Sequence, residues 1–140
     1  SIGRDRSGLF EPAVQEYAQR VRRIVPLELV ELKESDSREK EAAAVLAKIA
    51  PREVVVCLDE RGKELSSPEL AQRIGRWRDE SRDVAFLIGG DEGHAEEVRK
   101  RAEFTWSLSR LVLPHRLARV VVMEQIYRAF TILRGEPYHK

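Results

Sequence analysis

The segment from Leu87 to Gly93, with the sequence LIGGDEG, contains the residues best suited to holding a small ligand. Gly89 and Gly90 follow an apolar stretch, and a backbone without Cβ atoms lets main-chain amides approach a ligand closely. Asp91 and Glu92 then place two carboxylates in the same turn. Taken alone, this pattern is equally consistent with a turn that has only a structural role.

The two common phosphate-binding motifs do not fit this chain. A Rossmann fingerprint needs G-x-G-x-x-G and an acidic residue about twenty positions later, whereas this turn is GGDEG and the later region is Ser107 to Arg110. Gly62-Lys63-Glu64 lacks the earlier glycine and the Ser/Thr of a P-loop. Asp91 and Glu92 would also repel a pyrophosphate. A cofactor with a positive charge suits the turn better, and the sulfonium of S-adenosylmethionine is one such group.

Composition indicates one domain that can bury a core. The chain has 140 residues, of which 42% are apolar and 35% charged. It contains no apolar run near the roughly 18 residues that cross a bilayer and no secretory signal pattern, so we expect a cytoplasmic protein. The single cysteine, Cys57, lies in the apolar run Val54 to Leu58, which excludes a disulfide framework or a Cys-based zinc site and predicts a core position.

Charge is distributed unevenly along the chain. Residues 1–98 hold 16 basic and 21 acidic side chains, or −5, whereas residues 99–140 hold 9 basic and 3 acidic ones, or +6. This segregation suggests that the C-terminal third faces a polyanion. Arginines that merely solvate helix faces would give the same count, so charge alone leaves both interpretations open.

The expected elements alternate between helix and strand. Apolar residues at helical spacing from Leu9 to Val21, with Pro12 in the first turn, predict the first helix. The alternating segment Leu27 to Leu32 predicts a strand near a sheet edge. The spacing of Asp36 and Glu39 predicts a capping box at the start of a helix that runs to Ile49.

The middle of the chain predicts two strands of a parallel sheet. Val54 to Leu58 is apolar throughout, as in a strand covered on both faces, and residues 59–63 are expected to turn the chain. Ser67 is expected to cap a helix that Pro68 opens, and Val84 to Ile88 is the next strand. Strands joined by crossover helices give an α/β fold with helices on both faces and a ligand site at the carboxyl ends of the strands. Because the chain starts at Ser1-Ile2-Gly3 without a methionine, we expect the strand before the first helix to be truncated and residues 1–140 to form a single domain.

Four blocks in order carry a resemblance to a known family. They are LIGGDEG from Leu87, WSLSRLVLPH from Trp106, RVVVMEQIYRAF from Arg119 and PYHK at the end of the chain. Together with Val56 to Asp59 and Gly62-Lys63, they resemble the single-domain SPOUT methyltransferases, in particular the family of ribosomal RNA large subunit methyltransferase H, over nearly the whole chain. The resemblance implies a three-layer α/β fold with a C-terminal trefoil knot, a homodimer, and S-adenosylmethionine as cofactor without a metal. The implied substrate is the N3 position of a pseudouridine in large-subunit (23S) ribosomal RNA, reached within the ribosome.

The same resemblance implies which residues form the cofactor pocket. An adenine needs an apolar slot with a few main-chain hydrogen bonds, which leucine side chains and exposed backbone groups supply. The chain departs from the family at Asp91, where a proline is usual, and this affects the stiffness of the loop rather than its place. The implied cofactor-binding residues are Leu58, Gly89, Leu108, Ser109, Arg110, Leu111, Val112 and Leu113.

Three residues are candidates for handling the substrate. His139 and Tyr138 lie on a terminal tail that could close over a nucleotide, and an imidazole that titrates near neutrality could take the N3 proton. Arg119 could hold RNA phosphate. Each has a plainer interpretation, which is a solvated terminus for the tail and a surface charge or interface pair for Arg119. His115, after Pro114, is equally consistent with a local turn contact and a substrate contact.

The last expected helix has more apolar surface than one neighbour would cover. Its apolar residues spread beyond a single stripe, so we expect it to have two apolar neighbours. One is the sheet, and the homodimer that the resemblance implies makes the same helix of a second subunit the other. The apolar residues are Leu117, Val120, Val121, Met123, Ile126, Tyr127 and Phe130. The alternative to an enzyme is a non-catalytic RNA- or ribosome-binding module with the same fold, and cofactor binding would separate the two.

Overall fold

The computed structural model describes residues 1–140 and has a three-stranded sheet at its centre. Strand β1 (Val54–Glu64) lies between β2 (Val84–Leu87) and β3 (Phe104–Ser107), and both pairings are parallel. Val56 pairs with Phe86 on one side and Phe104 on the other. The predicted parallel sheet with an apolar central strand is therefore confirmed.

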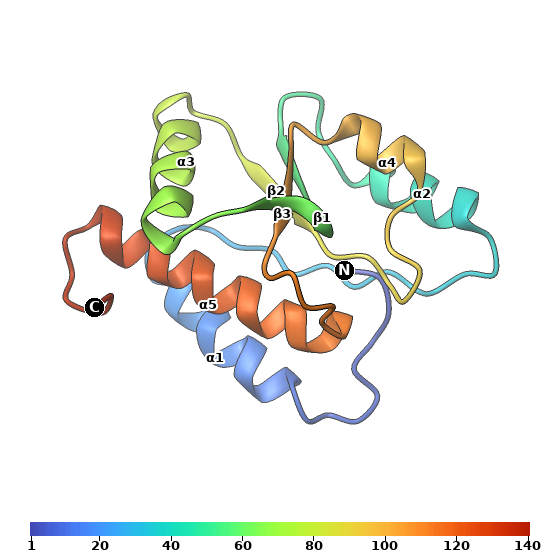
Figure 1. Ribbon diagram of the computed structural model, residues 1–140, viewed down its shortest axis with the longest axis horizontal. Helices are drawn as coiled ribbons and strands as arrows, with labels where there is room; N and C mark the ends of the chain where they lie inside the picture. The colour runs from blue at the N-terminus through green and yellow to red at the C-terminus, as the bar shows by residue number, and fades with distance from the viewer.

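Helices cover both faces of this sheet, as Figure 1 shows. Helices α1 (Glu11–Arg22), α3 (Ser67–Asp79) and α5 (His115–Leu133) lie on one side, and α2 (Arg38–Ala47) and α4 (Glu96–Arg101) lie on the other. The α/β class with helices on both faces is confirmed. None of these helices has the length and apolar character needed to span a membrane.

Strand β1 supplies side chains to two separate cores. Val54 and Val56 belong to the larger cluster, under α1, α3 and α5, whereas Val55 and Cys57 belong to the smaller one, beside α2 and α4. All four are at most 1% exposed. This two-sided burial explains why the run shows no polar alternation. Cys57 is a core residue as predicted, and burial raises the pKa of its thiol to about 11.

Two helices begin at a different cap from the predicted one. The N-cap of α2 is Ser37 rather than Asp36, because the Ser37 hydroxyl accepts a hydrogen bond from the Lys40 amide (3.3 Å). Helix α3 is capped by Ser66, whose hydroxyl accepts from the Glu69 amide while the Glu69 carboxylate accepts from the Ser66 amide. In both cases the serine one position away has the extended backbone that a cap requires.

The predicted strand at residues 27–32 is wrong as a regular strand. The segment forms only one bridge, between Leu32 and Ile2, and its other main-chain partner is the Ser1 amine, which donates to the Val30 carbonyl. The segment and β2 both line a cavity of about 560 Å³. The alternation of apolar residues therefore predicts that this segment is buried. A regular strand also needs the backbone of another strand beside it to form a ladder of hydrogen bonds.

The predicted turn at residues 59–63 is also wrong, because β1 continues to Glu64. The strand is irregular there, since Leu58 and Lys63 both pair with Trp106 of β3. Gly62 makes this possible: a Cβ atom at this position would lie 2.6 Å from the Thr105 carbonyl oxygen. A side chain would push β1 and β3 apart.

Candidate functional site

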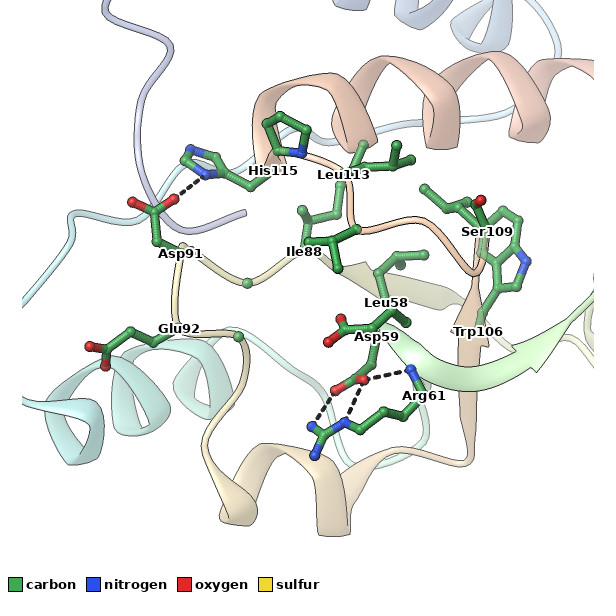
Figure 2. A pocket seen from close by; sticks show the side chains of 18 of the residues that line it. Leu58, Asp59, Arg61, Ile88, Asp91, Glu92, Trp106, Ser109, Leu113 and His115 are labelled. Carbon is green, nitrogen blue, oxygen red and sulfur yellow. Dashed lines mark hydrogen bonds and ion pairs between the residues drawn. The ribbon is translucent and has the colours of Figure 1, made fainter.

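The second half of β1 and the loops after β2 and β3 meet around a cavity of about 480 Å³ (Figure 2). Residues 58–61 in the second half of β1, the glycine turn after β2 and the segment 108–114 after β3 form its walls, and the first turn of α5 closes one side. The volume is in the range of small-ligand pockets, about 300 to 1,000 Å³. Because the carboxyl ends of parallel strands meet at one edge, three segments far apart in the sequence converge there.

The cavity has an apolar wall and a charged rim. The apolar side chains include Trp106 and Ile88, both buried, and Trp106 packs edge-on against Phe86. They form a slot suited to a flat aromatic group: Leu58, Ile88, Trp106, Leu108, Leu113 and Ala118. The charged side chains are Asp59, Glu60, Arg61, Asp91, Glu92 and Arg99. A ligand with one aromatic end and one charged end matches this division.

The glycine turn is folded tightly on itself. The Gly93 amide donates to the Gly90 carbonyl (3.0 Å), and Gly93 has a φ of +74°, which favours glycine. A Cβ at Gly89 would lie 2.8 Å from the Gly93 carbonyl carbon, whereas one at Gly90 would be 3.5 Å from the nearest atom, on Ile2. Gly89 is therefore needed to close the turn, while Gly90 has room for a side chain.

The side chains of His94 and Arg38 also hold this turn. The His94 ring lies 2.9 Å from the Leu87 carbonyl through Nε2, and the Arg38 guanidinium of α2 donates to the Glu92 and His94 carbonyls (3.2 and 2.9 Å). His94 is only 2% exposed, and its Nδ1 has no hydrogen-bond partner. Sequence reasoning did not single out either residue, because neither belongs to a recognisable motif.

The stability of the protein should fall as His94 becomes protonated in the unfolded chain. Burial lowers the pKa of His94 in the folded state below its ordinary 6.5. As the pH drops below about 6.5, the unfolded chain takes up a proton that the folded chain resists, so the free energy of unfolding decreases. We expect His94→Gln, which keeps a donor for Leu87, to flatten this decline between pH 7 and 5 in urea titrations. An equal decline in the variant would contradict this assignment.

Asp91 and His115 meet at one side of the cavity, as Figure 2 shows. His115 Nδ1 lies 3.1 Å from the Asp91 carboxylate, so the pair joins the glycine turn to the first residue of α5. The structure thus provides a local contact for His115, and its Nε2 is buried without a partner. Asp91 thus tethers the turn to the start of α5.

Seven of the eight cofactor-binding residues expected from the resemblance line this cavity. The exception is Arg110, which is exposed and outside the lining. The hydroxyls of Ser107 and Ser109 shape the loop, since Ser107 donates to the Ser109 carbonyl and Ser109 accepts from the Leu111 amide. The lining residues of this group are Leu58, Gly89, Leu108, Ser109, Leu111, Val112 and Leu113.

The tail residues Tyr138 and His139 lie away from the cavity of their own chain. No lining residue follows Ala118, and Figure 1 shows the C-terminus near the opposite end of α5. The Tyr138 hydroxyl donates to Glu124 (3.1 Å), and its ring packs against Tyr127. Burial and the Glu124 carboxylate raise the pKa of Tyr138 to about 12, so its hydroxyl stays protonated at neutral pH.

The contact between Arg128 and His139 determines which ring nitrogen carries the proton. Arg128 is held by Glu124 (2.9 and 2.6 Å) and lies 3.2 Å from His139 Nδ1. A guanidinium has only donors, so Nδ1 must accept and a neutral His139 carries its proton on Nε2. In this arrangement His139 presents an N–H donor, and it would have to leave Arg128 to accept a proton at Nδ1.

Arg119 is buried between three segments rather than at the cavity. Its guanidinium lies 2.8 Å from Glu11 of α1 and 3.1 Å from Glu31. The side chain therefore ties α5 to α1 and to the segment 27–32. A contact with RNA would require these intrachain ion pairs to open.

Comparisons with known proteins place the chain in a family. A family model described as "Predicted SPOUT methyltransferase" matches residues 1–139. This chain belongs to the SPOUT methyltransferase family. Proteins named "Ribosomal RNA large subunit methyltransferase H" from Anaeromyxobacter sp. and Anaeromyxobacter dehalogenans are 54% and 55% identical to it over 147 aligned positions. One from Cereibacter sphaeroides is 45% identical over 148 positions. All three alignments cover the whole chain and 96% of the relative, which confirms the resemblance seen in the sequence.

Proposed function

We propose that this protein methylates the N3 position of a pseudouridine in large-subunit ribosomal RNA, in the cytoplasm, with S-adenosylmethionine as the methyl donor. The observation that carries the proposal is the convergence of Leu58, the glycine turn and residues 108–113 on one cavity. Family membership and the printed names of the relatives support the reaction class and the RNA substrate. The position on the base rests on the resemblance of the sequence blocks.

The cavity residues fit this cofactor. When bound, S-adenosylmethionine supplies an electrophilic methyl group on a sulfonium. The apolar slot around Leu58 and Trp106 would hold an adenine and exclude water, and the glycine turn exposes main-chain groups. The carboxylates of Asp91 and Glu92 at the rim would favour the positive charge. Holding donor and acceptor in line supplies much of the rate acceleration in such a displacement.

The tail cluster offers hydrogen-bond donors to the RNA base that accepts the methyl group. N3 of pseudouridine carries a proton that must pass to the solvent before the nitrogen becomes a good nucleophile. A hydrogen-bond donor such as His139 Nε2–H, aimed at a carbonyl oxygen of the base, would stabilise the resulting anion. The Arg128 guanidinium behind His139 adds a fixed positive charge. We therefore propose that His139 and Tyr138 hold the base, with Glu124 and Arg128 positioning them.

The separation of tail and cavity within one chain supports a homodimer. We propose that the tail of one subunit reaches the cavity of the other, because the cavity lining ends at Ala118. The apolar residues Leu9, Leu111 and Val112 are 76%, 73% and 77% exposed, and Leu111 and Val112 border the cavity. Apolar surface of this kind is typical of an interface. The proposal includes the C-terminal trefoil knot that the resemblance implies.

We expect the protein to sediment as a dimer at micromolar concentration. Replacing Leu111 and Val112 together with aspartate should shift it towards the monomer, because two charges would then enter the apolar interface. Analytical ultracentrifugation measures this directly. A wild-type monomer at that concentration would contradict the shared site.

Cofactor binding tests the proposed function. Isothermal calorimetry should detect S-adenosylhomocysteine and S-adenosylmethionine binding to the wild-type protein, and Leu58→Asp should lose it, because a carboxylate would replace an apolar wall of the adenine slot. Absence of binding to the wild-type protein would favour a non-catalytic RNA-binding module.

A further inference from the structure

The charged rim of the cavity contains an arginine fixed by a buried carboxylate. The Asp59 side chain is 8% exposed and accepts hydrogen bonds from the Arg61 amide, Nε and Nη2 at 2.9, 2.9 and 2.8 Å. The hydrogen bonds from Arg61 lower the pKa of Asp59 to about 2, so the carboxylate is charged at neutral pH. Figure 2 shows this pair beside Leu58. The guanidinium is thus held at the cavity although most of it is exposed.

A second arginine faces the same carboxylate without a hydrogen bond. Arg99 of α4 lies with its Nε 3.8 Å from the Asp59 carboxylate, and this Nε is buried and has no hydrogen-bond partner. Both arginines line the cavity. The exposed Glu60 also lines it but forms no ion pair with either one. The two guanidinium groups therefore share one carboxylate. Some of their N–H donors remain available to an anionic ligand.

We propose that Arg61 and Arg99 form a subsite for the carboxylate of the methionine end of the cofactor. The proposal rests on the proposed function, which places an adenine in the apolar slot and so brings the amino-acid end to the charged rim. A guanidinium binds a carboxylate through charge-assisted hydrogen bonds with good geometry. The carboxylates of Asp91 and Glu92, elsewhere on the rim, suit the ammonium group of the same moiety.

Three ligands separate this subsite from the rest of the pocket. S-adenosylhomocysteine has the complete amino-acid end, its decarboxylated analogue keeps only the ammonium group, and 5′-methylthioadenosine lacks both groups. Calorimetry would measure each ligand on the wild type, Arg61→Gln, Arg99→Gln and Arg61→Lys. Arg78→Gln, in an exposed pair on α3, is the matched control. Arg99→Gln leaves the pair of Asp59 and Arg61 intact, so a folding defect in Arg61→Gln would not hide the result.

Each glutamine variant should weaken S-adenosylhomocysteine about tenfold, as expected for the loss of one charge-assisted hydrogen bond, and leave the other two ligands within about twofold. Arg61→Lys should recover part of the loss. Unchanged S-adenosylhomocysteine affinity in both glutamine variants would overturn the subsite, as would an equal loss for 5′-methylthioadenosine, which indicates a structural role. If the wild type binds none of the three ligands, the proposed function fails and the subsite fails with it.

Discussion

Deletion of Tyr138 to Lys140 is expected to reduce RNA methylation at least about a hundredfold while leaving S-adenosylhomocysteine affinity within about twofold. The deletion removes the His139 donor and the Tyr138 ring, whereas every residue that lines the cavity lies at or before Ala118. Groups that assist proton transfer contribute factors of about 10² to 10⁴. Single-turnover methyl transfer to ribosomes, with calorimetry on the same protein, would measure both quantities.

Point variants show how much of this loss of methylation each tail residue causes. His139→Gln keeps an N–H donor and should retain more activity than His139→Ala if the ring acts as a donor. If the imidazole is the base, both variants should be equally slow and their rates should depend less on pH near neutrality. Tyr138→Phe keeps the ring that packs on Tyr127 and loses only the hydrogen bond to Glu124. A truncated protein that methylates at the normal rate would show that the tail is only a solvated terminus.

Replacement of Gly89 by valine is expected to abolish measurable cofactor binding while the protein stays folded. Any Cβ there would lie 2.8 Å from the Gly93 backbone, so the turn must open and move the main-chain groups that face the cavity. The loop lies outside both cores, so the thermal midpoint should change little. Calorimetry with S-adenosylhomocysteine and a thermal melt would measure the two effects.

Gly90→Ala is the matched control for this prediction. A Cβ at Gly90 would have ordinary contacts, 3.5 Å from Ile2, so binding should remain within a fewfold of the wild type. Equal losses in the two variants would mean that the turn tolerates no side chain at all. Wild-type affinity in Gly89→Val would remove the turn from the cofactor site.

Elements with strong local patterns were predictable from the sequence. The run Val54 to Cys57 is apolar without interruption because its alternate side chains enter two cores. This uninterrupted apolar run predicts both that the segment is a strand and that the strand is central in the sheet. The segment 27–32 has an equally clear alternation, but its pairing depends on a neighbouring backbone, which no local pattern encodes. Strand β3 and helix α4 span only four and six residues, too few for a reliable periodicity.

The candidate site was predictable where it depends on loops that follow strands. The glycine turn and residues 108–113 converge as expected, because parallel strands deliver their carboxyl ends to one edge. The rim residues Asp59 and Arg61 were missed, although an acidic and a basic residue directly after an apolar run are a usable signal. The placement of Arg119 and of the tail depends on tertiary packing against α1 and α5, which residue spacing does not reveal.

Mass spectrometry of large-subunit ribosomal RNA tests most directly whether this protein methylates N3 of a pseudouridine, as we propose. RNA from cells that lack the gene should contain one pseudouridine without its N3 methyl group. Returning the wild-type gene should restore the methyl group, and returning the gene for the tail deletion should not. Identical methylation of large-subunit RNA in cells with and without the protein would contradict the account.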